Sequence, residues 1–313
     1  MNATPALDTA LRTVVPIALL VGAGVAARAT GVLRAGDARV LNAYVYWFAL
    51  PALFVVDISG MSLDPANARF VLAGVVPVVA AALLLGALAR VLGLARGAFA
   101  LVAVSTVFGS LAFFGIPFVM FAFPGREAER LAALGAAATS LVAVTLTVSL
   151  LEWARLEASG FLAGARVVVP RLARNPLLLS VAAGTALSLA GARLPQPLER
   201  PLHMLGTTTA TVSFFMLGAM LYGRRYTNLA AAAALALLRL VLLPLAALGV
   251  AALAGLGGLE RTVAVLMSGM PVAVSLLVLS ERYDFHRETV ASLVLVSSVG
   301  GAVTLNVWLR LLA

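Results

Sequence analysis

The sequence Gly-Ile-Pro at residues 115–117 lies inside an apolar stretch, residues 98–123, that is long enough to cross a bilayer. A matching Gly-Met-Pro at residues 269–271 lies inside a second apolar stretch, residues 262–280. Proline removes a backbone donor and clashes with the carbonyl one turn earlier, and glycine weakens the same turn. Such a break at membrane depth is tolerated only where the backbone is buried in protein or lines a wet cavity. The two triplets therefore predict two interrupted membrane helices.

The composition around these stretches is that of a membrane protein with several spans. Of 313 residues, 62% are hydrophobic and 11% are charged, whereas a soluble domain carries about 25% charged residues. The mean hydropathy is +1.06, and no hydrophilic stretch is long enough for a separate soluble domain. Cysteine is absent and only His203 and His286 are histidines, so we expect no metal centre and no cofactor.

Basic residues exceed acidic ones, giving a formal net charge of +9, and every basic residue is arginine. This excess favours cytoplasmic loops beside anionic membrane lipid over a nucleic-acid partner, because no nucleic-acid motif accompanies it. The predicted inner loops hold more arginines when both termini are placed outside. We therefore predict a multi-pass protein of the cytoplasmic membrane with both termini outside.

Apolar stretches of roughly 20 residues, the length that a span needs, alternate with short charged or turn-rich segments. They predict an all-α fold of ten transmembrane helices, at residues 11–27, 38–57, 69–92, 98–122, 131–152, 175–192, 202–222, 228–254, 262–280 and 289–311. The longest break, residues 153–174, carries Arg155, Arg166, Arg171 and Arg174 and is predicted to be a basic cytoplasmic linker. It separates a five-helix half at 1–152 from another at 175–313.

The two halves resemble each other. Their Gly-X-Pro triplets are 154 residues apart, and each is followed by a short charged turn. Each half closes on a similar sequence, Thr-Leu-Thr-Val at 145–148 and Thr-Leu-Asn-Val at 304–307. Because five spans is an odd number, the second copy would enter the membrane inverted, as in many secondary carriers. Chance similarity between simple apolar sequences is the alternative.

Paired interruptions in corresponding segments point to a transporter's substrate site. Each proline suits the first turn of a new helix, whose free N–H groups carry about half a positive charge. Two such helix starts facing one cavity would hold an anion, and the hydroxyls of Ser110 and Ser275 are best placed to add donors. The alternative is that the prolines merely kink packed helices.

Few charged residues lie inside the predicted spans. Arg239 lies near mid-depth and could attract the anion or pair with Asp57; otherwise its long side chain reaches the interface or caps backbone carbonyls. We expect Asp57 and His203 to be interfacial. No acid lies beside either triplet, which argues against a proton relay there, whereas sodium could bind unwound carbonyls. Hydroxyls that should bond to their own helix or to its neighbours are those of Thr207, Thr208, Thr209, Thr211 and Ser213.

An ordered set of short motifs resembles the auxin efflux carrier family of membrane transporters. It comprises Leu50-Pro51-Ala52-Leu53, Phe108-Gly109-Ser110, Phe114-Gly115-Ile116-Pro117, Asn175-Pro176-Leu177, Met270-Pro271-Val272-Ala273-Val274 and Ser280-Glu281-Arg282-Tyr283. The resemblance covers nearly the whole chain. In one respect the chain departs from the family, which often has Asn at the positions of Ser110 and Ser275. Serine keeps a donor but loses the reach of the amide.

The resemblance implies two inverted repeats whose fourth and ninth helices cross at their broken points. It implies a scaffold of helices 1, 2, 6 and 7, a transport domain of helices 3–5 and 8–10, and small organic anions as substrates (dicarboxylates in bacteria, auxin in plants). The substrate-binding residues we expect are Ser110, Gly115, Ile116, Pro117, Arg239, Gly269, Met270, Pro271 and Ser275.

These observations predict a secondary carrier for a small organic anion that works by an elevator-like motion. A sodium-coupled symporter of a larger amphipathic acid and a sensor that does not transport remain alternatives. An enzyme is not expected, because no cluster of acids, histidines or an activated nucleophile is apparent. Membrane lipid is an expected partner, and a homodimer is left open.

Overall fold

The computed structural model of the chain describes residues 5–34, 36–62, 64–155 and 174–312. This part is almost wholly helical, and within it the one β pairing is an isolated antiparallel bridge between Gly109 and Val272. Most of the predicted linker, residues 156–173 with Arg166 and Arg171, lies outside the described residues.

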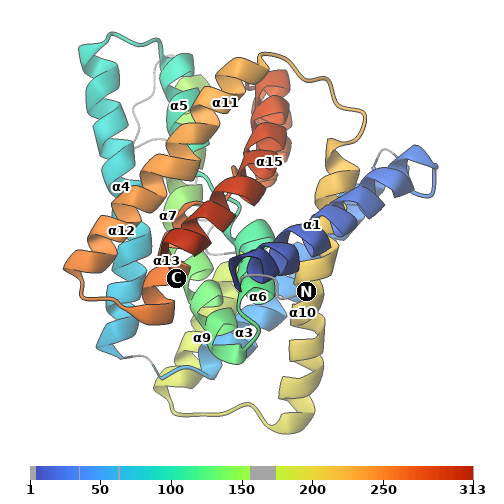
Figure 1. Cartoon of the computed structure of the whole chain (residues 1–313), viewed down its shortest axis with the longest axis vertical. Coiled ribbons are helices and arrows are strands. Elements are labelled where there is room, and N and C mark those ends of the chain that lie inside the picture. The colour runs from blue at the N-terminus through green and yellow to red at the C-terminus, as the bar shows by residue number, and fades with distance from the viewer. Residues whose placement is uncertain (1–4, 35, 63, 156–173, 313) are drawn as a thin grey trace.

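The first half of the described chain contains α1 (Pro5–Ala29), α2 (Asp37–Tyr44), the π-helical turn η1 (Val45–Ala49), α3 (Leu50–Ser59), α4 (Pro65–Val91), α5 (Arg96–Val107), the π-helical turn η2 (Leu111–Gly115), α6 (Ile116–Ala122) and α7 (Arg126–Arg155). The second half contains α9 (Pro176–Leu189), α10 (Gln196–Leu221), α11 (Leu229–Leu237), the π-helical turn η3 (Leu238–Leu242), α12 (Leu243–Leu253), α13 (Gly258–Ser268), α14 (Ser275–Tyr283) and α15 (Arg287–Leu312). Figure 1 shows their arrangement.

Seven helices of the described chain are long and apolar enough to cross a membrane, which confirms the prediction of a multi-pass protein. They are Leu11–Ala29, Asp37–Ser59, Pro65–Val91, Arg126–Ala154, Gln196–Leu221, Leu229–Leu253 and Arg287–Leu312. The predicted span at 175–192 is the shorter α9, and the predicted spans at 98–122 and 262–280 are each divided into two shorter helices.

Each of the three π-helical turns is followed two residues later by proline: Pro51 after η1, Pro117 after η2 and Pro244 after η3. The wider turn accommodates the proline ring and the missing N–H while the helix continues. The carbonyl of Leu240, four residues before Pro244, instead accepts a hydrogen bond from the indole Nε1 of Trp308 at 3.1 Å. A side chain on α15 thus replaces the donor that Pro244 lacks.

The helices pack in two groups that meet along α7 and α6 (Figure 1). In the first group, α1 and α10 lie side by side and α3 packs against α9 and α10. Glycines bring α1 and α10 into backbone contact, because a Cβ at Gly24 would lie 1.9 Å from the carbonyl oxygen of Phe215. In the second group, α4 packs against α5, α7 and α12, while α11 packs against α15.

Candidate functional site

Two interruptions divide helices in the second group, and they differ in length. The first separates α5 from η2 at residues 108–110, and the second separates α13 from α14 at residues 269–274. Gly269-Met270-Pro271 therefore lies in its break, as predicted. The prediction for Gly115-Ile116-Pro117 was wrong in position, because the helix runs without interruption from Leu111 to Ala122 and takes Pro117 in after the π-helical turn.

The two breaks are hydrogen-bonded to each other through their backbones. Ser110 N donates to the carbonyl oxygen of Pro271 at 2.8 Å, and Ala273 N donates to that of Phe108 at 2.9 Å. These two bonds flank the bridge between Gly109 and Val272. Each break thus satisfies backbone groups that the other leaves without a helical partner, which is the condition for irregular backbone inside a membrane protein. We call this region the crossing (residues 108–110 and 269–274).

Arg239, on η3, supplies a buried positive charge at the crossing. Its side chain is 1% exposed; its Nε donates to the carbonyl oxygen of Met270 and its Nη1 to that of Thr106, both at 2.6 Å. A Cβ at Gly109 would lie 1.6 Å from Nη2, so only glycine leaves room for the guanidinium. The two carbonyls lie at the C-terminal ends of α5 and α13, where helix dipoles favour a cation.

Of the roles considered for Arg239, capping of backbone carbonyls is confirmed and pairing with Asp57 is wrong. Asp57, on α3, instead has Arg126 beside it, with 3.5 Å between Oδ1 and Nη1. No acidic side chain among the described residues pairs with Arg239, and the dipoles of the two carbonyls take the place of a carboxylate. No spacing between residues in the sequence predicts these two carbonyl partners.

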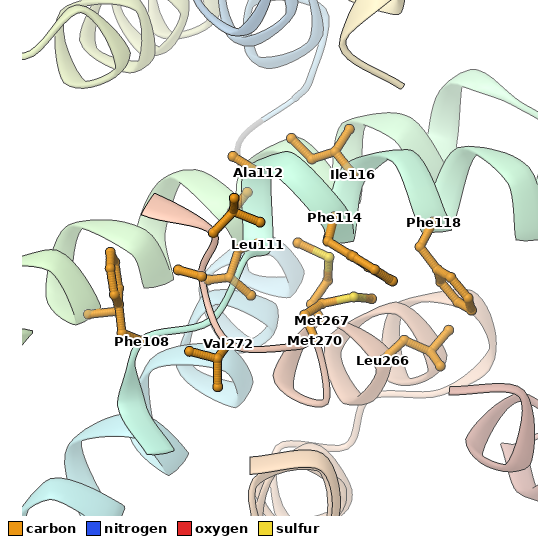
Figure 2. Close-up of a cluster of buried hydrophobic side chains, with 14 of the residues drawn as sticks. Phe108, Leu111, Ala112, Phe114, Ile116, Phe118, Leu266, Met267, Met270 and Val272 are labelled. Carbon is orange, nitrogen blue, oxygen red and sulfur yellow. The ribbon is translucent and has the colours of Figure 1, made fainter. Parts of the chain in front are cut away.

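Side chains of the predicted site pack where η2 passes over the second break. A Cβ at Gly115 would lie 2.9 Å from the sulfur of Met267 and 3.1 Å from Cγ of Met270, so η2 makes a close approach here. Figure 2 shows Phe114 on the same side as these methionines, whereas Ile116 points away from them. Ile116 is fully buried, yet its side chain does not face the crossing.

The two predicted serines differ in their surroundings. Ser110 is 3% exposed, and its hydroxyl has no hydrogen-bond partner among the described residues. Ser275 is half-buried at the first position of α14. The next two N–H groups of α14, those of Leu276 and Leu277, donate to the carbonyl oxygens of Ala273 and Val274. Two of the N–H groups at the start of α14 are therefore already hydrogen-bonded within their own turn. The Ser110 hydroxyl, in contrast, remains available as a donor.

Ser297, on α15, is a polar residue at the crossing that sequence reasoning missed. Its hydroxyl accepts a hydrogen bond from Val272 N at 3.1 Å and lies 3.3 Å from the carbonyl oxygen of Val294, to which it donates. It thereby satisfies an N–H of the second break. Its place inside an apolar helix was visible in the sequence, but nothing there linked it to residue 272.

The cavity beside the crossing is small in this conformation. It measures about 10 Å³, and its lining residues include Arg239, Thr139 and Ser268 as well as the apolar Phe70 and Met267. A volume of this size holds about one water molecule. The crossing is therefore closed to an organic anion as it stands, and access would need a rearrangement of the helices around it.

The remaining polar predictions have mixed outcomes. Thr207, Thr208 and Thr211 donate to carbonyls of their own helix, as expected, whereas the hydroxyls of Thr209 and Ser213 have no partner in the described part of the chain. Asp57 is buried in protein, at 0% exposure, near the end of α3. His203 is half-buried, with Nε2 3.2 Å from Oε1 of Glu129.

The fold is that of a multi-pass membrane protein, because several of its helices are apolar and long enough to span a membrane. Two further helices are interrupted inside the bundle and joined at their breaks, as in proteins that carry a solute. The chain belongs to the membrane transport protein family, the auxin efflux carrier family, whose profile matches residues 9–309. This result confirms the resemblance seen in the sequence, and the family is one of transporters rather than enzymes. The search of curated proteins finds no match to the chain.

Proposed function

We propose that the protein is a secondary transporter of a small organic anion, a carboxylate or an auxin-like acid, in the cytoplasmic membrane. The observation that carries this proposal is the pair of backbone hydrogen bonds that joins residues 108–110 to 271–273. Carriers bind their substrates where interrupted helices meet inside the bundle. In this proposal α5–η2–α6 and α13–α14 are the two crossing helices of ten, arranged as two inverted five-helix repeats with both termini outside.

The substrate is proposed to bind at the starts of the helices that follow the two breaks. Support comes from the buried hydroxyl of Ser110, which has no partner among the described residues, and from the positive charge of Arg239 beneath the crossing. Helix starts and a nearby cation favour a carboxylate over a neutral or cationic solute. The proposed binding residues remain Ser110, Gly115, Ile116, Pro117, Arg239, Gly269, Met270, Pro271 and Ser275, although Ile116 would act through packing rather than contact.

An elevator-like motion is proposed to expose the crossing to each side of the membrane in turn. The scaffold would consist of α1, α2–η1–α3, α9 and α10, and the moving part would contain the crossing with α4, α7 and the helices that pack on them. The backbone contact of α1 with α10 supports a rigid scaffold, because glycines there leave no room for sliding. Motion would take place where α7 meets α3 and where α6 meets α1 and α10.

Sodium coupling is the second candidate, and the surroundings of Arg239 argue against a sodium ion at the crossing. Carriers that bind sodium there use unwound carbonyls and the C-terminal ends of half-helices. Here the carbonyls of Thr106 and Met270 already accept hydrogen bonds from the guanidinium. Arg239 thus holds the position that a coupling cation would need, which favours transport that does not depend on sodium.

The test is a thermal-shift screen of mono- and dicarboxylates with the purified protein, in sodium and in choline buffers. We expect at least one organic anion to raise the melting temperature equally in both buffers, and the same anion to undergo counterflow in proteoliposomes. A strict requirement for sodium would favour the symporter. A ligand that stabilises the protein but shows no counterflow would favour a sensor and contradict the proposed transport.

A further inference from the structure

A group of ionisable side chains lies where α3, α7 and α10 meet, on other elements than those of the crossing. We call it the Asp57 cluster, and its members are Asp57 on α3, Arg126, Glu129 and Arg130 on α7, and Glu199 and His203 on α10. At its centre, a carboxylate oxygen of Asp57, one of Glu129 and a ring nitrogen of His203 all lie within 4.8 Å of one another. Two further elements pack against α3, namely α9 and η1, and neither carries a charged residue.

The carboxylate of Asp57 is buried, and no described residue donates a hydrogen bond to it. Its side chain is 0% exposed, and neither oxygen accepts a hydrogen bond from any residue that the structure describes. Arg126 Nη1 stands 3.5 Å from Oδ1, while Nη2 of the same guanidinium donates to Oε1 of Glu199 at 2.7 Å. Burial of an ionised carboxylate that lacks hydrogen bonds is strongly unfavourable. Asp57 has a positive neighbour in Arg126, but no described side chain donates a hydrogen bond to either of its oxygens.

One proton would remove the imbalance of charge in the Asp57 cluster. Its three carboxylates and two guanidinium groups leave one negative charge when His203 is neutral. His203 Nε2 lies 3.2 and 3.3 Å from the two oxygens of Glu129, so imidazole and carboxylate already form a pair. A proton added to Asp57 would turn an acceptor-only group into a donor beside this pair.

An open hollow of about 620 Å³ lies beside the Asp57 cluster. Two members of the cluster, Arg130 and Glu199, line this hollow together with Ser59 and Gly60. The guanidinium of Arg130 lies directly against Gly60, where a Cβ would be 2.4 Å from Nη2. The hollow therefore exposes two charged members of the Asp57 cluster to solvent at a place away from the crossing.

We propose that the Asp57 cluster is a proton-binding site that joins α7 to α3 and α10, and that its proton is taken up and released once in each transport cycle. The second part rests on the proposed function, in which α7 moves relative to α3 and α10. Such a motion would withdraw Arg126, Glu129 and Arg130 from Asp57 together, which changes the charge around that carboxylate. Proton binding and helix position are then linked, and each affects the other by the same free energy.

Infrared difference spectroscopy of the purified protein tests proton binding without any substrate. A protonated buried carboxyl has a C=O stretching band that an ionised carboxylate lacks. We expect this band in the wild type, its loss in Asp57→Asn, and an altered pH dependence in Glu129→Gln and His203→Gln. Asp64→Asn is the matched control, since Asp64 is exposed and only caps α4, a task that Asn also performs. A wild-type band that persists in Asp57→Asn would overturn the site.

Two further measurements separate the parts of the proposal. If the wild type binds Zn²⁺ and releases protons as it does so, whereas His203→Gln does not bind, the cluster is a metal site and the proton assignment is wrong. In proteoliposomes, an inward proton gradient should accelerate uptake of the anion identified by the thermal-shift screen at least several-fold, and Asp57→Asn should abolish the acceleration. Transport that ignores the gradient while the infrared band is present would overturn the coupling and leave the proposed anion transport intact.

Discussion

Arg239 and Asp57 are both buried charged side chains within the apolar part of the molecule, but their surroundings differ. Arg239 donates to two backbone carbonyls at 2.6 Å and fits against Gly109, whereas Asp57 accepts no hydrogen bond from the described residues. The first charge is satisfied by rigid backbone at the crossing. The second lies among long ionisable side chains that come from three different helices. The contrast indicates a permanent charge at one place and an exchangeable one at the other.

The largest effect is expected from Arg239→Ala. It leaves the carbonyls of Thr106 and Met270 buried without donors and creates a void, so we expect a loss of about 3–5 kcal/mol of stability and no measurable transport. Thermal unfolding and counterflow measure the two consequences. Arg239→Lys keeps the charge but cannot span both carbonyls as a planar guanidinium does. If Arg239→Lys restored full stability, charge alone would explain the site, and the geometry of the two bonds would be unimportant.

Gly109→Ala tests the placement of the Arg239 guanidinium by changing the residue against which it packs. The new Cβ would lie 1.6 Å from Nη2 of Arg239, so the guanidinium must leave its place between the two breaks. We expect a loss of about 2–3 kcal/mol and slower transport, measured as above. Gly22→Ala is the control, because no atom lies within 4 Å of the Cβ that it would add. Gly125→Ala would not serve as a control, because the φ of +153° at Gly125 strains any side chain. Equal melting temperatures for Gly109→Ala and Gly22→Ala would contradict the close fit of the Arg239 guanidinium against Gly109.

The sequence predicted more of the helices than of the contacts between them. Helix positions follow from apolar length and from proline and glycine, which act locally, and the described helices lie close to the predicted spans. The position of the first break did not follow, because a π-helical turn absorbs Pro117 and moves the interruption to residues 108–110. Partners such as Met270 for Arg239, or Val272 for Ser297, depend on tertiary packing that no local pattern encodes.

A smaller effect, confined to binding, is expected from Ser110→Ala combined with Ser275→Ala. The hydroxyl of Ser110 has no partner among the described residues, so its removal should cost little stability. Loss of donors to the anion should weaken binding about tenfold, which corresponds to about 1.4 kcal/mol. The thermal-shift response to the stabilising anion measures the affinity. Ser297→Ala is the informative contrast, because it removes the acceptor of Val272 N and should lower stability instead. Unchanged affinity in the double variant would place the anion elsewhere.

The smallest effect on stability is expected from Asp57→Asn, in direct opposition to Arg239→Ala. If Asp57 holds a proton, the substitution exchanges one neutral group for another of nearly the same shape, and the free energy of unfolding should change by less than about 0.5 kcal/mol. Thermal unfolding at neutral pH, with Asp64→Asn alongside, measures it. A loss of several kcal/mol would mean that an ionised Asp57 is stabilised by Arg126 at 3.5 Å. In that case both buried charges would be permanent, and the contrast between the two regions would disappear.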